Sequence, residues 1–378
     1  MFHYDIMNYK NMEKFMKLVI VDNKNKKQFI QYYKNQHLNN PLKRDSLSGM
    51  VKSLLYGKSV LCKSVDLQPL MVMDNNKILM ICILAYAHRM NDYIQISFFE
   101  SEEFNIKAFN MILNRAEKWA KEKGASKISA SLNIHVNYGL GFLDSHYDAP
   151  QSFGMGHNPP FYHEYFKQNG FTPIPMVSYK KNMTQVHELL NKNIRKKIES
   201  KYTVREVNFN NLQSEVDIYT KINNEAFKKH LFYYPRKKEE DMELFKDLKF
   251  LLKPENLIFV EKDEAPVGFM LWYPDFNQLI KPSETVGIKT VIKNKLFHKK
   301  INTFKIVEMG VIPSEQNKGA IFALFNYCFK CTKGKYDFFE SSWILEDNIN
   351  SRCFGIKWAD GESKHYKAYI KELNNENI

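Results

Sequence analysis

The apolar and polar positions in the first half of the chain predict strands that alternate with helices. Between residues 104 and 123, apolar side chains recur at spacings of three and four, which is typical of a helix packed on a sheet, and Gly124 is a natural residue to end it. A second helix is predicted over 161–168. Short apolar or alternating runs typical of strands fall at 17–22, 68–74, 77–88, 92–99, 127–134 and 177–179. The first half is therefore predicted to be an α/β unit.

The second half repeats this order of elements. Strands are predicted at 203–208, 256–261, 266–273, 304–311, 336–344 and 365–373, and helices at 215–229, 319–330 and near 348. Residues 183–201 contain neither Pro nor Gly and are too polar for a buried helix, so they predict a helical connector. We therefore expect a duplicated fold, with one domain at 1–182, the connector at 183–201 and a second domain at 202–378.

The composition narrows the class of protein. Hydrophobic residues make up 44% of the 378 residues and charged residues 26%, as in folded globular proteins, which excludes a disordered chain. The longest uncharged apolar run, 79–87, is far shorter than the roughly 20 residues of a membrane-spanning helix. The first 15 residues lack the continuous apolar core of a signal peptide. We expect a cytoplasmic protein without a membrane partner.

The formal net charge of +13 raises the question of a nucleic-acid partner. The charge comes from 48 Lys and only 7 Arg, whereas Arg is the residue suited to bidentate recognition of phosphates and bases. The excess of Lys runs along the whole chain together with Asn and Ile. A nucleic-acid partner is therefore not expected.

The five cysteines do not form a recognisable metal motif. Cys328 and Cys331 make a C-x-x-C pair, but it falls in an apolar helical stretch, and no second pair exists to complete a zinc site. We expect buried helix cysteines and no metal.

The stretch 304–331 contains the most informative motif. A strand is predicted to end at Val311, and the polar loop 314–318 then leads into a helix that begins at Gly319. Backbone N–H groups at a helix N-terminus, together with the helix dipole, form a site for anions. Lys318 adds a cation, and Gly319 lets a phosphate approach the backbone without a Cβ clash.

This motif, V-x-P-x-x-Q-x-x-G at Val311, Pro313, Gln316 and Gly319, resembles the coenzyme A pyrophosphate loop of the GNAT N-acetyltransferase superfamily. The last position of the family signature, Q/R-x-x-G-x-G/A, is Ile321 here instead of a small residue. The resemblance implies an α/β fold of two tandem domains, each a mixed, mostly antiparallel sheet flanked by helices, with acetyl-CoA or another acyl-CoA as co-substrate. The residues that it implies for binding this co-substrate are Met309, Val311, Gln316, Asn317, Lys318, Gly319, Ala320 and Asn348.

The first half resembles the same superfamily more faintly. Residues 161–171, FYHEYFKQNGF, are similar to the family's closing helix. The place of the phosphate loop is taken by Glu100, Glu102 and Glu103, and carboxylates at a helix N-terminus repel a pyrophosphate. We expect a degenerate copy that binds no coenzyme A.

The resemblance also implies N-acyl transfer, which needs a base for the amine and an acid for the departing thiolate. Glu308, three residues before Val311 on the same strand, is the candidate base. In the family, the tyrosine that acts as the general acid usually stands seven residues after the asparagine that corresponds to Asn348, and that position is Gly355 here. Other tyrosines open as substitutes are Tyr327, Tyr366 and Tyr369.

The function expected from these residues is acetyl transfer from acetyl-CoA to an amine of a small molecule or a peptide. Two alternatives remain open from the sequence. A Fem-type aminoacyltransferase also pairs two such domains, and it would use aminoacyl-tRNA, which the positive charge would suit. A non-catalytic binding protein is favoured by Gly355 and by the degenerate first half.

Overall fold

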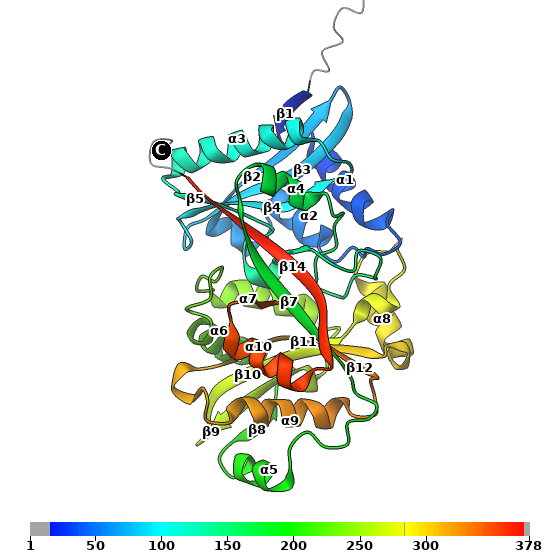
Figure 1. Cartoon of the computed structure of the whole chain (residues 1–378), viewed down its shortest axis with the longest axis vertical. Helices are drawn as coiled ribbons and strands as arrows, with labels where there is room; N and C mark the ends of the chain where they lie inside the picture. Colours follow the sequence, from blue (N-terminus) through cyan, green and yellow to red (C-terminus); the bar gives the residue numbers. More distant parts are fainter. Residues whose placement is uncertain (1–15, 283, 374–378) are drawn as a thin grey trace, which may run out of the picture.

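The computed structural model describes residues 16–282 and 284–373 and has the expected mixed α/β architecture (Figure 1). The first half contains β1 (Met16–Ile20), α1 (Lys26–Leu38), α2 (Ser48–Leu55), β2 (Val65–Asp74), β3 (Lys77–Ala87), β4 (Tyr93–Ser101), α3 (Ile106–Lys123), β5 (Lys127–Ala130), β6 (Phe142–Leu143), α4 (Tyr162–Gln168) and β7 (Thr172–Asn182). The second half contains β8 (Thr203–Glu206), α6 (Leu212–Ala226), α7 (Lys238–Leu248), β9 (Leu257–Lys262), β10 (Ala265–Pro274), α8 (Ile288–Phe297), β11 (Thr303–Val311), α9 (Ala320–Thr332), β12 (Phe338–Ser341), β13 (Ile344–Leu345), α10 (Ile349–Trp358) and β14 (Gly361–Glu372). The repeated order of elements is confirmed.

Each half builds the same pattern of strand pairing. In the first half, β1, β2, β3 and β4 pair antiparallel in sequence, and β4 then pairs with β5 in parallel. In the second half, β8, β9, β10 and β11 pair antiparallel, and β11 pairs with β12 in parallel. A helix, α3 or α9, connects the two strands of each parallel pair, as a parallel crossover requires.

The two halves exchange their closing strands. β14, from the second half, pairs with β5 of the first, while β7, from the first half, pairs with β12 of the second. β7 and β14 also pair with each other, with Tyr366 opposite Met176, so both halves share one continuous sheet. Figure 1 shows these two strands running side by side through the middle of the molecule.

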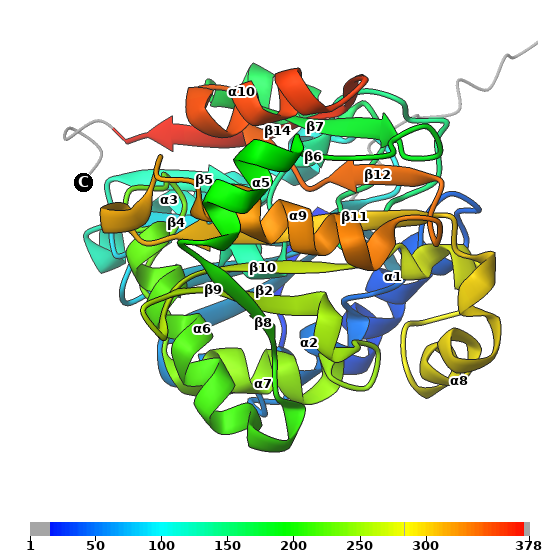
Figure 2. The ribbon, with the colours of Figure 1, turned by 90° about the horizontal axis from the view of Figure 1, so that it is seen from below.

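Helices cover both faces of each half-sheet. Phe109, Ile112 and Ala116 on α3 pack with α4 against one face of the first half, and α1 and α2 cover the other. In the second half α9 covers one face and α6 and α7 the other, as seen from below in Figure 2. Gly124 ends α3 with a φ of 67°, as its position predicted. No helix in the described part of the chain is long and apolar enough to cross a bilayer.

The connector differs from the expected helix over 183–201. Only α5 (Lys192–Glu199) is helical, and Asn191 caps it by accepting a hydrogen bond from the Ile194 N–H at 2.9 Å. The preceding residues instead pass along the end of β12, where the Met183 N–H donates to the Asp337 carbonyl at 2.7 Å. α5 lies against α9 (Figure 2), and its one buried apolar residue, Ile198, joins the core of the second half.

Candidate functional site

A cavity of about 440 Å³ lies between the two halves. Phe98 and His157 from the first half and Tyr273 and Trp343 from the second are among its lining residues, and most of its wall is apolar. Its volume falls in the range of sites for small molecules and cofactors. The closing strands bring the halves together here, because residues of β7 and of the segments around β13 and α10 line the same cavity.

β11 and β12 diverge beside this cavity. They pair in parallel only as far as Ile306 and Ser341, and beyond this point β11 pairs with β10 alone. A β-bulge at Val307 bends the strand and changes the direction of its side chains. Residues 307–309 line the cavity, and one backbone edge of 307–311 pairs with no described strand. This open edge offers N–H and C=O groups to an extended ligand.

Glu308 is half-buried, and its carboxylate group accepts two hydrogen bonds from α6. The Tyr219 hydroxyl donates to one oxygen, and Asn223 Nδ2 donates to the other at 2.6 Å. Burial raises the pKa of Glu308 to about 6, with the nearby charge of Asp241 acting in the same direction, although the two hydrogen bonds lower it. A carboxylate with this pKa is ionised at neutral pH and accepts a proton readily, as a general base must.

A buried ion pair lies behind Glu308. Arg236 and Asp241 are fully buried, with Nε and Oδ1 2.5 Å apart. Arg236 also donates to the Tyr138 hydroxyl at 3.1 Å and contacts His135 Nδ1 at 3.2 Å, both from the first half. Burial and the Arg236 charge lower the pKa of His135, so its ring is neutral and accepts this hydrogen bond. The ion pair therefore fixes one wall of the cavity across the two halves.

The loop before α9 has the geometry of an anion site. Gln316 is anchored by a hydrogen bond from its Nε2 to the Val311 carbonyl at 2.9 Å. Gly319 adopts a left-handed conformation with φ of 106° and precedes α9 directly. Among the described residues, the N–H groups of 317–319 donate to no backbone carbonyl. An exposed row of N–H groups at the positive end of a helix fits a pyrophosphate.

Lys318 is only partly available to such an anion. Its ammonium lies 3.5 Å from the carboxylate of Glu315, which also accepts hydrogen bonds from Lys262 at 2.9 Å and from the Tyr202 hydroxyl at 2.8 Å. These hydrogen bonds, with that of Lys262 the strongest, hold the pKa of Glu315 at about 2. The loop itself carries one cation, Lys318, and one carboxylate, Glu315. Lys262, at the end of β9, adds a second cation, so the net charge around the loop still favours an anion.

The predicted site residues fall into two groups. Glu308, Met309 and Asn348 line the cavity, where the Asn348 side chain also caps α10 by accepting from the Ser351 N–H at 3.2 Å. Val311 and residues 316–320 do not line it; they lie at the far end of β11 and the start of α9. The open edge of β11 connects the two groups.

Gly355 has no room for a side chain. An added Cβ would lie 2.6 Å from the ring of Tyr179, which is buried and lines the cavity from β7. The Tyr179 hydroxyl accepts a hydrogen bond from Arg352 Nε at 3.4 Å. A tyrosine from the exchanged strand of the first half thus occupies the space beside Gly355, the position at which the sequence resemblance implies a tyrosine.

The three tyrosines considered from the sequence lie elsewhere. Tyr327, Tyr366 and Tyr369 do not line the cavity. Tyr327 donates to Glu206 at 3.0 Å, and the Tyr369 hydroxyl pairs with His163 at 2.7 Å. They have no access to a ligand in this cavity.

The expectation that Glu100 stands at a helix N-terminus is wrong. β4 runs on to Ser101, and α3 begins only at Ile106, capped by Asn105. Glu100 is buried at the first-half end of the cavity, 3.1 Å from His37 Nε2 and 3.0 Å from Lys43 Nζ. Lys43 and His37 outweigh the effect of burial and hold its pKa at about 2, so Glu100 stays ionised. That the first half binds no coenzyme A stays a prediction.

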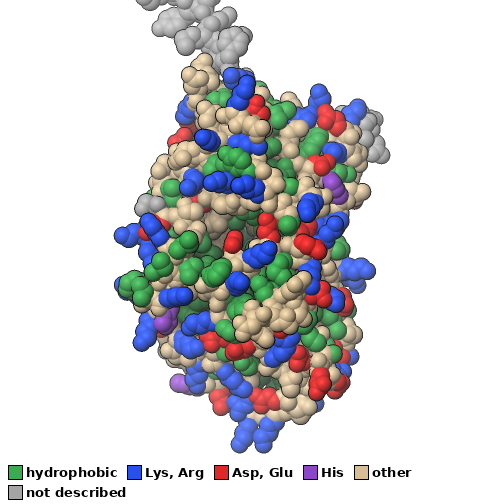
Figure 3. Space-filling view, turned by 180° about the vertical axis from the view of Figure 1, so that it is seen from behind, with side chains coloured by type: hydrophobic (Ala, Val, Ile, Leu, Met, Phe, Trp, Pro, Cys, Tyr) green, Lys and Arg blue, Asp and Glu red, His purple; other side chains and the backbone are tan. Residues whose placement is uncertain are grey.

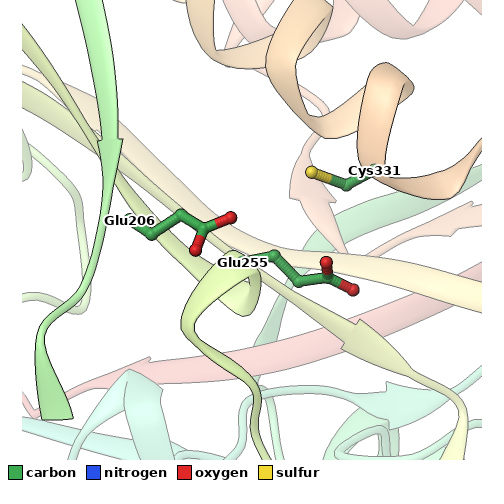
Figure 4. Close-up of side chains that lie close together, drawn as sticks. All are labelled: Glu206, Glu255 and Cys331. Atoms are coloured by element: carbon green, nitrogen blue, oxygen red, sulfur yellow. The ribbon is translucent and has the colours of Figure 1, made fainter.

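One cluster among the described residues has side chains suited to a metal: Glu206, Glu255 and Cys331 (Figure 4). Both carboxylates already have partners, since Tyr327 donates to Glu206 and Lys335 lies 3.4 Å from Glu255. Burial and these two carboxylates raise the pKa of the Cys331 thiol to about 11. The thiol is therefore protonated at neutral pH, and nothing at this cluster points to a bound ion.

Sequence reasoning missed the residues that surround Glu308. Tyr219 and Asn223 lie four residues apart, so they share one face of α6, and both are fully buried. A tyrosine and an asparagine on the apolar face of a predicted helix are a signal that could have been noticed. His230 and Tyr233, which also line the cavity, come from an irregular segment after α6 that gives no such signal.

Comparison of sequences finds two distant relatives, and no family model matches the chain. Protein YghO of Escherichia coli (strain K12) is 25% identical over 275 residues, which cover 70% of each chain. A bacterial ceramide synthase of Caulobacter vibrioides (strain NA1000 / CB15N) is 23% identical over 275 residues, 70% of this chain and 72% of that protein.

Solved structures share the whole architecture. A tandem GNAT protein from the clavulanic acid biosynthesis pathway superimposes with a TM-score of 0.54 at 10% identity, over 95% of this chain and 99% of that one. A GCN5-related N-acetyltransferase from Sphaerobacter thermophilus gives 0.51 at 10% identity, over 94% and 95%. The repeated halves, the divergent parallel strands and these structures agree: the chain has the tandem fold of the GCN5-related N-acetyltransferase superfamily.

Proposed function

We propose that the protein transfers an acyl group from an acyl-CoA thioester to an amine, with Glu308 as the general base. The observation that carries this proposal is a carboxylate with a pKa of about 6 in the wall of an apolar cavity, at the point where β11 and β12 diverge. The superfamily fold alone would not support acyl transfer as the function, because one fold hosts many functions.

Glu308 accepts a proton from the attacking amine, directly or through one water molecule. The amine nitrogen forms a bond to the thioester carbonyl carbon, and the carbon–sulfur bond breaks. Tyr219 and Asn223 hold the carboxylate in place during this transfer. Burial keeps the pKa of Tyr219 well above its usual value, so this hydroxyl remains a donor.

The backbone of β11 and the loop before α9 are the proposed site for coenzyme A. The N–H groups of 317–319 and Gly319 would bind the pyrophosphate, and the open edge of β11 would pair with the amide groups of the pantetheine arm. Asn348 and Met309 would then contact the thiol end in the cavity.

Tyr179 is the proposed acid that protonates the thiolate. It lines the cavity beside Gly355, where its ring takes the place of the family's tyrosine, and its hydroxyl has a cation, Arg352, as its neighbour. The residue therefore comes from the opposite half of the chain.

The apolar walls favour an acyl chain or an acceptor longer than those of simple acetyl transfer to a small polar amine. An alkyl chain gains about 0.8 kcal/mol for each buried CH₂ group, so an apolar cavity of this size selects for chain length. The relative named a bacterial ceramide synthase fits this proposal, because a ceramide is the amide of a fatty acid and a long-chain amino alcohol. Long-chain amino alcohols and long acyl-CoAs belong in the first substrate screen.

The test measures release of free coenzyme A thiol from acetyl-CoA and from longer acyl-CoAs, with a panel of amines that includes long-chain amino alcohols. We expect amine-dependent release with the wild-type protein, and loss of it in Glu308→Gln with acyl-CoA binding retained. Release that does not depend on any amine, or equal activity in the variant, would contradict the proposal. The same panel with aminoacyl-tRNA distinguishes the Fem-type alternative, which needs no intact loop at 316–319.

A further inference from the structure

An unusual row of apolar side chains is exposed on α8. Ile288, Ile292 and Leu296 are 81%, 52% and 67% exposed. They lie four residues apart, so they follow one face of the helix. In a globular protein such a face normally packs on the core, yet Thr290 is the one buried residue in this helix.

The apolar surface continues beyond α8. Phe297, at the end of the helix, is 44% exposed, and Phe250, after α7, is 61% exposed. Asn294 Nδ2 donates to the Leu251 carbonyl at 3.1 Å, which holds the Phe250 segment beside α8. We call these residues, with Ile288, Ile292 and Leu296, the α8 surface.

The charged residues of α8 and of the turn that follows it are all positive. Residues 287–300 contain five lysines and no acidic residue. Lys293 pairs with Glu284, whereas the other four, Lys289, Lys295, Lys299 and Lys300, form no ion pair with a described residue. Figure 3 shows hydrophobic and lysine side chains gathered along this edge of the molecule.

We propose that the α8 surface binds the surface of an anionic lipid bilayer. A helix with long apolar side chains on one face and lysines beside them lies at a bilayer interface, where the apolar side chains enter the acyl region and the lysines remain among the anionic headgroups. Nucleic acid would satisfy the lysines but would leave the isoleucines and phenylalanines in water. This proposal departs from the absence of a membrane partner expected from the sequence, which considered spanning segments only.

The α8 surface is connected to residues that line the cavity. The segment before α8 is tied to the first half by the Val286 N–H, which donates to the Asp45 carbonyl at 2.9 Å. The next residues, Ser46 and Leu47, line the cavity, and so does Leu248, two residues before Phe250. A lipid that leaves the bilayer at the α8 surface would therefore meet residues next to those that line the cavity.

The test is sedimentation of the purified full chain with vesicles, and it requires no enzymatic activity. One set of vesicles is phosphatidylcholine alone, and the other contains phosphatidylglycerol as well. We expect binding to the anionic vesicles that weakens with added salt, with about a fivefold contribution from each lysine that reaches the headgroups. Equal binding to both vesicle types would overturn the role of the lysines.

The apolar part is tested with Ile288→Ser/Ile292→Ser, and the matched control is Ile20→Ser/Ile194→Ser. The control removes two isoleucines that are 53% and 47% exposed but lie outside the α8 surface. All four residues are exposed, so both variants should fold. We expect the first variant to bind anionic vesicles at least about tenfold more weakly and the control to bind like the wild type.

Four outcomes would each refute the proposal. They are an equal loss of vesicle binding in both variants, no vesicle binding by the wild type, preference of the protein for duplex DNA over vesicles, and a dimer that the first variant disrupts. Since binding is measured without substrate, failure of this proposal and failure of the proposed function are distinguishable.

Discussion

Replacement of Glu308 by Gln removes one proton acceptor and leaves the shape of the side chain. The variant still accepts a hydrogen bond through its Oε1, from Tyr219 or Asn223, so the wall of the cavity should keep its form. Binding of acyl-CoA should change little, because the proposed contacts of this substrate are made by the backbone of β11 and of the loop before α9 and by Met309 and Asn348, not by the Glu308 side chain. A loss of turnover with binding retained therefore isolates the proton transfer.

The size of the loss follows from the pKa of about 6. General-base catalysis contributes about 10²–10⁴-fold, so the variant should be slower by at least about 100-fold at neutral pH. Because Glu308 is about 90% ionised at pH 7 and about 10% ionised at pH 5, the wild-type kcat/KM should lose roughly tenfold from this group alone over that interval. The acceptor amine loses reactivity as well when it is protonated at lower pH. That loss is common to both proteins, and it cancels in the ratio of wild-type to variant kcat/KM.

The assay is the pH dependence of this ratio, from thiol release at low acyl-CoA and amine concentrations. We expect a constant ratio of 100 or more, as an order of magnitude, above about pH 7, and a tenfold fall for each pH unit below about pH 5.5, as titration of one carboxyl requires. Thermal shifts with acyl-CoA serve as the binding control. A ratio near one, or a large ratio that does not change through pH 6, would show that Glu308 is not the base.

Three further predictions test other parts of the site. Gly319→Glu should abolish the thermal shift given by acetyl-CoA, because it places a negative charge at the proposed pyrophosphate site. The control Gly319→Ala carries the same backbone strain at φ of 106° and should weaken binding less. Equal thermal shifts in the two variants would contradict the assignment. Titration calorimetry with acetyl-CoA should give one site per chain, since the first half carries Glu102 and Glu103 in place of a phosphate loop, and two sites would disprove a degenerate copy. Gly355→Ala should lower the free energy of unfolding by about 1–3 kcal/mol, because its Cβ would lie 2.6 Å from the Tyr179 ring. Gly361→Ala, with no atom within 4 Å of its Cβ, is the matched control in urea unfolding, and equal stability of the two variants would refute the packing argument.

Most of the strands, and helices such as α3 and α9, could be predicted because their patterns are local, whereas α7 and α8 were not expected from the sequence. Alternation and the spacing of apolar residues depend on neighbours in the sequence, and the helix that ends at Gly124 and the strand that ends at Val311 lie where these patterns place them. The expected connector helix was longer than α5 because polarity shows that a segment is exposed but not that it is helical.

The pairing of the strands could not be predicted in this way. β7 and β14 carry the same alternation as any half-buried strand, and nothing in that alternation states which strand lies beside them. As a result, the contribution of Tyr179 to the wall beside Gly355 was beyond reach, since it depends on a strand from the first half entering the second. Glu308 was identified through a resemblance, while its raised pKa depends on burial and on Tyr219 and Asn223, which only the fold brings to it.

The exchange of β7 and β14 also sets an order of events during synthesis. The first half of the chain emerges from the ribosome long before β14, which ends at Glu372. One edge of β5 therefore stays unpaired until β14 has been synthesised. β7 emerges early too and must wait for β12. An unpaired strand edge invites association with other chains, and a chaperone bound to the newly made first half would protect it during this interval. The nascent chain should therefore remain sensitive to proteases until β14 is available, and only then acquire the resistance of the folded protein in a single late step.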